Sequence, residues 1–375
     1  MTKKIVLLST IAKDTLLFRS EFIVSLVNSG HQMIVCCVDY TPETAQEIRS
    51  LGAEPVNYDL DRGGINPLAD LWCVFKITRL LKQLNPDVVL CRAVKPTIYG
   101  SIAARLAGVA RRVSILEGLG YAFTDLPQGF ELKQFVLKKI QIFLYRISLP
   151  FVHELIFLNN DDPVDLLNRH RLHVSSYKIL GGIGLDLNNF KFHPAPLKPV
   201  RFIFIGRLLA EKGVFEYVVA AKKVKNKYPD VEFVVLGSLD KRNPGALKED
   251  ELHQLLDAEI ILYPGYVDNV SEWVATSSVF VLPSYREGVP RSTQEAMAIG
   301  RAILTTDVPG CRDTVADGVN GFLVPRWNAE ALAEKMIYLI DHPEEIERMG
   351  QESHRIAVER FDVHQVNKRL TAWLL

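Results

Sequence analysis

Residues 201–213 read RFIFIGRLLAEKG, and this stretch decides how the chain folds. An apolar, β-rich run over Arg201–Ile205 leads directly into a loop that has glycine at positions 206 and 213. Apolar residues with helical spacing follow over Val214–Lys227. A strand, a glycine-containing loop and a helix in this order are typical of a doubly wound parallel α/β sheet.

The same alternation continues on both sides of this stretch. Asn66-Pro67 predicts the start of a helix, with an N-cap residue followed by proline at the first helical position, and Asn85-Pro86 predicts its end. We therefore expect an α/β protein built from two Rossmann-like, doubly wound parallel sheets. Further strands are predicted over Ile5–Leu8, Met33–Val38, Val88–Cys91, Arg112–Ile115, Val231–Leu236, Val279–Leu282 and Ala302–Thr305, and a further helix over Ser292–Ile299.

A proline-rich break, HPAPLKP at residues 193–199, predicts the linker between the two domains. The expected division is an N-terminal domain over 1–195, a C-terminal domain over 196–355, and a last helix over 356–375 that crosses back to the first domain. Ligands of such sheets bind beyond the carboxyl ends of the strands, so we expect a site in a cleft that both domains face.

Composition excludes several classes of protein. Of the 375 residues, 48% are hydrophobic and 23% charged, as in a globular enzyme and unlike a disordered chain. With 44 basic and 44 acidic residues the formal net charge is zero, which argues against a nucleic-acid partner. The five cysteines form no CxxC pair, which indicates reduced thiols in a cytoplasmic protein and no zinc site. No run is apolar enough to predict a transmembrane helix.

The loop after the strand Arg201–Ile205 has the composition of an anion site. Gly206 lets a ligand approach the backbone, and the following helix presents free N–H groups. Arg207 can bind a diphosphate in a bidentate way, and Lys212 adds a point charge. The loop is neither GxGxxG nor a P-loop, which argues against a dinucleotide oxidoreductase and a P-loop NTPase. An ordinary solvated turn stays open as the alternative.

A second loop, PSYREGVPRSTQEAM at residues 283–297, again follows an apolar strand. It carries Glu287 in the loop and Glu295 more than one turn into the expected helix. A carboxylate accepts hydrogen bonds from neighbouring hydroxyls, such as those of a sugar or a ribose. Two surface glutamates near a helix start are the alternative.

These elements together resemble the family 4 retaining glycosyltransferases, which have the GT-B fold. The resemblance rests on three motifs in order, it covers nearly the whole chain, and it is denser after residue 200. Within the family, residues 290–292 and 305–312 resemble enzymes that extend sugars on polyprenyl diphosphate carriers. The motifs are Gly206-Arg207 with Glu211-Lys212-Gly213, Glu287-x7-Glu295, and Asp307-x-Pro309-Gly310 with Asp317-Gly318-x-Asn320-Gly321-Phe322-Leu323-Val324.

The resemblance implies a role for each matching residue. Arg207 and Lys212 would hold the nucleotide diphosphate beside Gly206 and stabilise the leaving group without a metal. Glu295 would hold the ribose and Glu287 the donor sugar, with the N–H groups of Gly288 and Val289 near the sugar and phosphate. The implied activity is retaining transfer of a hexose or N-acetylhexosamine, with no cofactor, from a nucleotide sugar. The donor would be a UDP-sugar, the acceptor a polyprenyl-diphosphate-linked sugar, and the process surface-glycan biosynthesis.

The chain departs from the family pattern in its first domain. Ser9-Thr10-Ile11-Ala12 stands where members often have a Gly-Gly pair, and Glu117 lies near the place of a cleft histidine in many members. Asp59-Leu60-Asp61 matches a short DxD metal motif, with a plain polar loop as the favoured alternative.

A basic amphipathic segment covers residues 128–150. It contains Lys133, Lys138, Lys139 and Arg146 with no acid between the first and last of them, and apolar residues interleave. Such a helix is typical of a membrane-surface element, so we expect the protein to lie peripherally on an anionic surface, at the inner face of the plasma membrane. A buried helix with a solvated basic edge is the alternative.

The residues leave two other functions open. One is a nucleotide-sugar epimerase of the same two-domain architecture. The other is a non-catalytic subunit that binds a nucleotide sugar.

Overall fold

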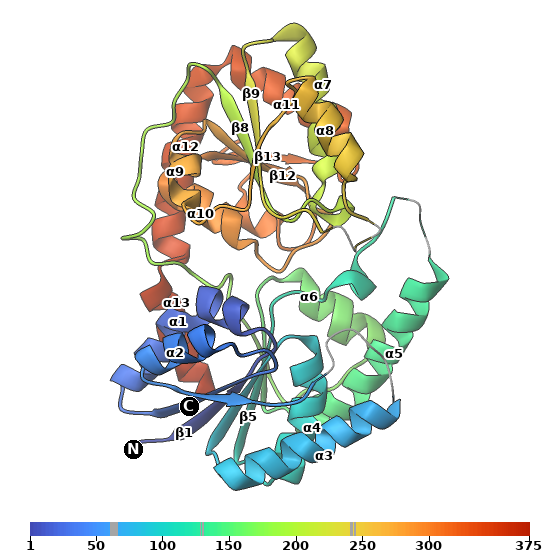
Figure 1. Ribbon diagram of the computed structural model, residues 1–375, viewed down its shortest axis with the longest axis vertical. Helices are drawn as coiled ribbons and strands as arrows, with labels where there is room; N and C mark the ends of the chain where they lie inside the picture. The colour runs from blue at the N-terminus through green and yellow to red at the C-terminus, as the bar shows by residue number, and fades with distance from the viewer. Residues whose placement is uncertain (61–66, 128, 130, 241–242, 244) are drawn as a thin grey trace. The chain divides into compact units, whose positions relative to one another are not determined.

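The computed structural model describes residues 1–60, 67–127, 129, 131–240, 243 and 245–375. The chain forms two compact units, each an α/β assembly around one parallel sheet (Figure 1). The first unit comprises Met1–Phe123, Glu131–Ile183 and Val363–Leu375, and the second comprises Thr124–Phe130 and Gly184–Asp362.

The first unit has a seven-stranded parallel sheet in the order β3-β2-β1-β4-β5-β6-β7. Ile5 on β1 lies opposite Met33 on β2 and Val88 on β4, so the strand order reverses direction on the two sides of β1. The strands are β1 (Lys4–Leu8), β2 (Gln32–Cys37), β3 (Glu54–Asn57), β4 (Val88–Arg92), β5 (Arg111–Leu116), β6 (Glu154–Phe157) and β7 (Tyr177–Ile179).

Helices cover both faces of this sheet. One face carries α1, α2 and α13, and the other carries α3, α4 and α5 over a buried apolar core (Figure 1). The helices are α1 (Ala12–Asn28), α2 (Pro42–Ser50), α3 (Pro67–Leu84), η1 (Pro96–Gly100), α4 (Ser101–Leu106), η2 (Tyr121–Phe123), α5 (Leu132–Ser148), η3 (Leu149–Phe151), α6 (Asp161–Pro163), η4 (Val164–Asn168) and α13 (Val363–Leu374).

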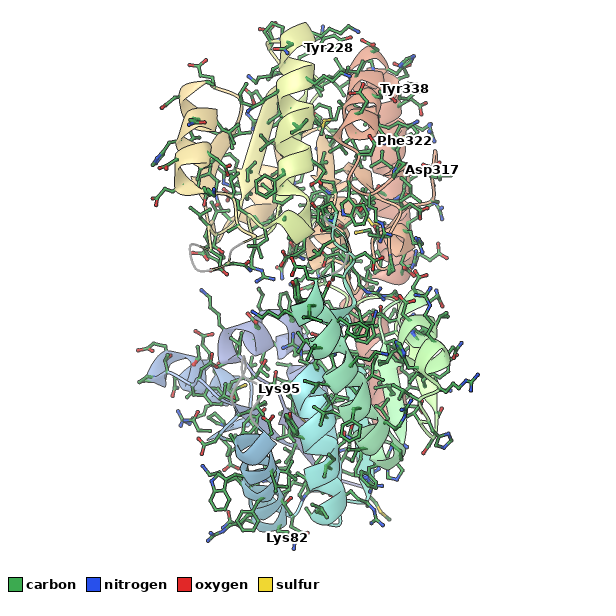
Figure 2. All side chains as sticks on the ribbon, turned by 90° about the vertical axis from the view of Figure 1, so that its right-hand side faces the viewer. Lys82, Lys95, Tyr228, Asp317, Phe322 and Tyr338 are labelled. Atoms are coloured by element: carbon green, nitrogen blue, oxygen red, sulfur yellow. The ribbon has the colours of Figure 1, made fainter. Side chains whose placement is uncertain are left out.

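The second unit repeats the plan with six parallel strands in the order β10-β9-β8-β11-β12-β13. One face carries α7 and α11, the other α9, α10 and α12, and Phe322 of β13 packs edge-to-face on Tyr338 of α11 (Figure 2). The elements are β8 (Arg201–Ile205), η5 (Ala210–Lys212), α7 (Val214–Lys227), β9 (Glu232–Leu236), α8 (Glu249–Asp257), β10 (Leu262–Gly265), α9 (Val270–Ala275), β11 (Val279–Leu282), α10 (Arg291–Ile299), β12 (Ala302–Thr306), η6 (Arg312–Thr314), β13 (Gly321–Val324), α11 (Ala329–Asp341) and α12 (Pro343–Arg360).

The two predicted doubly wound parallel sheets are confirmed. β8, α7 and β11 have the predicted bounds, and the other predicted strands and the helix α10 differ by one residue at one or both ends. α3 begins at the predicted Pro67, whereas the predicted N-cap, Asn66, lies outside the described residues. Within the described part of the chain, no helix combines the length and the apolar character that crossing a bilayer requires.

The segment that precedes the proline-rich stretch belongs to the second unit. Gly184 N–H donates to the Gln294 side chain at 3.1 Å, and His193 N–H donates to the Ile299 carbonyl at 3.0 Å. These bonds hold the segment on the second unit before residue 196 is reached.

The last helix belongs to the first unit. α13 packs on α1, and the Arg111 guanidinium on β5 donates to the carbonyls of Trp373 and Leu374 at 2.5 and 3.3 Å.

Two loops of the second unit touch backbone to backbone at Gly213. This residue has φ +77°, and a Cβ added to it would lie 2.0 Å from the carbonyl oxygen of Pro283, which follows β11. Glycine is required here both for its left-handed conformation and for the missing side chain. The loops after β8 and β11 are thereby held together.

We expect Gly213→Ala to lower the free energy of unfolding by about 2–5 kcal/mol, because it adds a steric clash to an unfavourable backbone conformation. Gly30→Ala is the matched control: Gly30 has φ +82° but nothing lies within 4 Å of an added Cβ, so only about 1–2 kcal/mol is lost. Urea unfolding of both variants measures the difference. Equal losses would show that Pro283 does not restrict residue 213.

Candidate functional site

The predicted donor-site residues gather where the order of the second sheet reverses. β8 and β11 are neighbours at this point, and their carboxyl ends continue into the loops 206–213 and 283–290. Ligands of open α/β sheets bind at such a switch point. Six predicted residues lie on these two loops and one lies on the helix that follows: Gly206, Arg207, Lys212, Glu287, Gly288 and Val289, with Glu295 on α10.

The first loop is anchored by buried apolar side chains. Leu208 and Leu209 are fully buried, and Gly206 N–H donates to the carbonyl of Leu236 at 3.0 Å. Arg207, between these anchors, is exposed, and Lys212 is partly buried. The loop therefore holds its backbone rigidly while it presents two cations.

Lys212 and Glu287 form an ion pair across the two loops. The distance from Lys212 Nζ to Glu287 Oε1 is 2.5 Å, and the side chains are 22% and 12% exposed. Ser284 Oγ donates to the same carboxylate oxygen at 2.8 Å. The sequence assigned these two side chains to different parts of a ligand and did not predict that they contact each other. A bound diphosphate would share the ammonium group with Glu287.

The backbone under Glu287 is held by the loop after β12. Glu287 N–H donates to the carbonyl of Pro309 at 3.0 Å. Gly310 has φ +80°, and an added Cβ would lie 2.4 Å from the carbonyl oxygens of both Glu287 and Gly288. The Asp307-x-Pro309-Gly310 motif thus packs against the backbone of the loop 283–290. Val289 is buried, and its carbonyl accepts from the Gln294 side chain at 3.2 Å.

Glu295 has a different partner. Arg291, one turn earlier on α10, donates through Nε to Glu295 Oε1 at 2.8 Å, and the Glu295 side chain is 13% exposed. Burial raises the pKa of Glu295, and Arg291 opposes this shift. A carboxylate with so little water around it can accept hydrogen bonds from ligand hydroxyls at a small desolvation cost.

Tyr285 links the loop 283–290 to α7, the helix that follows the loop 206–213. Its hydroxyl donates to Glu216 Oε1 on α7 at 2.8 Å, its N–H donates to the carbonyl of Glu211, and its ring packs edge-to-face on Trp327. Burial raises the pKa of Glu216. Tyr285 lies within the motif at residues 283–297, but the sequence predicts no role for it.

Glu117 lies in the first unit, at the carboxyl end of β5. Arg92, at the end of the neighbouring strand β4, donates to Glu117 Oε2 through Nε at 2.8 Å and Nη2 at 2.7 Å. Arg19 on α1 donates to Oε1 through Nε at 3.1 Å and also through Nη2. The exposed fractions are 19% for Glu117, 7% for Arg92 and 2% for Arg19.

Two arginines keep the Glu117 carboxylate charged. Burial alone would raise the pKa of Glu117, but Arg92 and Arg19 more than offset burial and lower it to about 2. Arg92 Nη1 also donates to Ser9 Oγ at 3.3 Å, which ties the cluster to the loop after β1. Neither arginine is among the site residues predicted from the sequence, although a charged residue at the end of the apolar run Val88–Arg92 is a usable signal for Arg92.

Of the Asp59-Leu60-Asp61 stretch, the structure describes the first two residues. Asp59 Oδ2 accepts from Lys76 Nζ at 2.6 Å, and Asp61 lies outside the described residues. Among the described residues, no three His, Cys, Asp or Glu side chains gather in a way that could hold a metal ion.

Comparison with known proteins places both units in glycosyltransferase families. Residues 186–355 match the family described as glycosyl transferases group 1, and residues 4–159 match the family described as glycosyl transferase 4-like. A curated relative from Campylobacter jejuni, N,N'-diacetylbacillosaminyl-diphospho-undecaprenol alpha-1,3-N-acetylgalactosaminyltransferase, is 30% identical over 80% of each chain. Another from Escherichia coli, UDP-Gal:alpha-D-GlcNAc-diphosphoundecaprenol alpha-1,3-galactosyltransferase, is 28% identical over 74% of this chain and 72% of the other.

The fold agrees with solved structures. Alr3699/HepE from Anabaena, solved with UDP-glucose, superimposes with a TM-score of 0.77 at 18% identity, covering 99% of this chain and 98% of the other. The relatives are transferases, which favours a transferase over the epimerase and the binding subunit that the residues alone left open. The chain belongs to the family 4 glycosyltransferases of the GT-B fold, and it is a glycosyltransferase.

Proposed function

We propose that the enzyme transfers a hexose or N-acetylhexosamine from a UDP-sugar to a sugar carried on polyprenyl diphosphate, with retention at the anomeric carbon, in surface-glycan biosynthesis. The observation that carries the proposal is the grouping of Lys212, Glu287 and Ser284 in contact at the switch point of the second sheet, with Arg207 on the same loop. The name of the E. coli relative includes a UDP-sugar donor, and the names of the C. jejuni and E. coli relatives both include a sugar on undecaprenol diphosphate, which supports the acceptor class.

The donor binds through its diphosphate. Lys212 and Arg207 supply two positive charges at the start of α7, where free N–H groups also favour an anion. They stabilise the charge that develops on the leaving diphosphate, the role that a divalent cation has in other transferases. Glu295 accepts from the ribose hydroxyls and Glu287 from the donor sugar. Gly206, Gly288 and Val289 allow the ligand to approach the backbone.

The transfer proceeds on one face of the donor sugar. The bond between the anomeric carbon and the diphosphate oxygen breaks, and the acceptor hydroxyl oxygen bonds to the same face of that carbon. The proton of the acceptor hydroxyl moves to the leaving phosphate oxygen. Lys212 stays bound to that phosphate as its negative charge grows, so no side-chain nucleophile and no cofactor is required.

The acceptor binds to the first unit, with Glu117 as a fixed anion. Its carboxylate is held by two arginines and is partly exposed, so it can accept a hydrogen bond from a sugar hydroxyl. A pKa of about 2 makes it unsuitable as a general base near neutral pH, since such a base works best with a pKa near the working pH. The role is therefore positioning, which differs from that of a titrating histidine.

The enzyme works at the inner face of the plasma membrane. Its acceptor is a membrane lipid, and the face of α5 that is turned to solvent carries Lys133, Lys139 and Arg146. Attraction to an anionic leaflet is worth about 1 kcal/mol per cation. A nucleic-acid partner is not proposed, because the net charge of the chain is zero.

Lys212→Ala and Arg207→Ala should each weaken UDP binding about ten- to 150-fold, because a charge-assisted hydrogen bond contributes roughly 1.5–3 kcal/mol. Lys222→Ala, an exposed lysine of α7, is the control and should leave the affinity unchanged. Titration calorimetry with UDP measures all three. If Lys212→Ala and Arg207→Ala both kept the wild-type affinity for UDP, the diphosphate would not bind at this loop.

The two glutamates of the donor site should separate in their effects. Glu295→Gln should weaken UDP and UDP-sugar alike, since both carry the ribose. Glu287→Gln should keep UDP affinity or raise it, because it releases Lys212 from its ion pair, while turnover with a polyprenyl-diphosphate-linked sugar falls. Calorimetry measures the affinities, and initial rates measure the turnover. If Glu287→Gln lost UDP binding and Glu295→Gln kept it, Glu287 would be the residue that binds the ribose and Glu295 the one that binds the sugar.

The low pKa of Glu117 should make the free energy of unfolding depend on pH in the acid range. The pKa falls from 4.5 to about 2 on folding, so (4.5 − 2) × 1.36 gives about 3 kcal/mol of stability that is present above pH 4.5 and is lost as the pH falls toward 2. Glu117→Gln should therefore flatten stability against pH over this range, and Glu21→Gln, on the exposed side of α1, should not. Urea unfolding at pH 7, 4.5 and 3 measures this, and parallel curves for wild type and Glu117→Gln would contradict it.

A further inference from the structure

We propose that the outer surface of α3 and α4 is a membrane-docking site, in which an apolar groove takes the hydrocarbon chain of an anionic bilayer lipid. We call it the α3–α4 groove. It has a volume of about 440 Å³ and is lined by Leu71, Trp72, Val74, Phe75, Thr78 and Leu106. The proposal rests on the proposed function, because an acceptor carried on a membrane lipid requires that the enzyme reach the bilayer.

The groove exposes large apolar side chains side by side. The exposed fractions are 69% for Leu71, 58% for Trp72, 55% for Phe75 and 59% for Leu106. The rings of Trp72 and Phe75 stack with their centroids 5.2 Å apart. Scattered exposed apolar residues need no explanation, but a continuous patch that lines a groove marks an interaction site.

Helix spacing shows that these side chains do not serve the core of the unit. Cys73, Ile77 and Leu81 point inward and belong to the buried core cluster. Leu71, Trp72 and Phe75 occupy the opposite side of α3 and stay in contact with solvent. The core of the unit does not use these three side chains. An apolar environment outside the protein therefore explains their presence better than packing within the protein does.

Charge identifies that environment as an anionic lipid surface. The chain as a whole has 44 basic and 44 acidic residues, yet α3, α4 and α5 together carry eight cations and one acid, Asp70. Lys82 is among the side chains at the outer surface of the first unit (Figure 2). The eight cations are Lys76, Arg79, Lys82, Arg105, Lys133, Lys138, Lys139 and Arg146.

The same face continues onto α5. η1 contacts both α3 and α5, and α4 contacts α3, so these helices form one layer. On α5 five apolar side chains are also exposed between the cations: Leu132 (71%), Phe135 (41%), Val136 (46%), Phe143 (58%) and Ile147 (43%). Apolar side chains that insert below a ring of Lys and Arg are the chemistry of an interfacial membrane site. A hydrophobic partner protein would not require so large an excess of one charge.

Co-sedimentation with vesicles tests the groove. Wild type should bind vesicles of equal parts phosphatidylglycerol and phosphatidylcholine, and added salt should weaken the binding as it screens exposed charges. Trp72→Glu with Phe75→Glu should lower the partition coefficient at least roughly tenfold, since two apolar side chains no longer leave water. Val219→Glu, which replaces a 55% exposed side chain of α7, is the matched control and should bind as wild type does. Circular dichroism and Tm confirm that the variants fold.

A second measurement does not depend on a charged substitution. Lipids brominated along their acyl chains should quench part of the tryptophan fluorescence of the wild type. Trp72→Phe should keep vesicle binding within about twofold but lose that quenching, because Trp72 alone lines the groove among the four tryptophans. A triple variant should weaken vesicle binding, but the tryptophan fluorescence of the protein that still binds should be quenched as in the wild type. Its substitutions are Lys133→Glu, Lys138→Glu and Lys139→Glu.

The outcomes separate this proposal from the proposed function. Vesicle binding by the wild type with no transfer to any polyprenyl-diphosphate-linked sugar would overturn the function alone. Transfer by the wild type with equal vesicle binding by Trp72→Glu/Phe75→Glu would overturn the groove alone, as would wild type that binds no vesicles. The wild type could instead form a dimer that dissociates in the double variant, while vesicle binding stays unchanged. That result would assign the groove to contact with a second copy of the chain and would overturn the proposal of a lipid.

Discussion

The contact between Gly213 and the carbonyl of Pro283 is the constraint on which the candidate site depends. It fixes the spacing of two loops that leave neighbouring strands of one sheet. Lys212 stands one residue before the contact and Ser284 one residue after it, so their meeting at Glu287 follows from the backbone. Gly310 applies the same principle from the next strand along, where its missing Cβ leaves room for the carbonyls of Glu287 and Gly288. Two glycines thus determine the separation of a cation, a carboxylate and a hydroxyl.

Sequence alone predicted the parts of this arrangement that are local. β8, α7 and β11 were assigned to the residue because apolar runs end in glycine or proline and helical spacing begins at once. The residue types of the two loops also predict an anion site in one and a hydroxyl-binding site in the other. The sequence did not predict contacts between residues that are far apart along the chain. Lys212 and Glu287 are 75 residues apart, and no rule of sequence spacing predicts that they meet. Arg19 is 98 residues from Glu117, and only the parallel sheet brings them together.

The carboxylates of the two units show how the surroundings decide the behaviour of one chemical group. Glu117 and Glu295 are both largely withdrawn from water, yet burial prevails at Glu295 and raises its pKa, while two arginines prevail at Glu117 and lower it. One arginine only moderates the effect of burial, as Arg291 does. The number of cations around each carboxylate therefore decides whether folding raises or lowers the pKa of that group.

The return of α13 to the first unit has a consequence for how such an enzyme can evolve. Apart from the short stretch Thr124–Phe130, the second unit lies between Ile183 and Val363, so in the order of the gene it is an insertion within the first. The carbonyls of Trp373 and Leu374 bind Arg111 on a central strand, which makes the end of the chain part of the first unit's own structure. A recombination event that exchanged everything after the linker would remove that helix. An exchange of the internal segment alone would preserve it, so the second unit can be replaced with least damage to the first by exchanging the middle of the gene and keeping both ends.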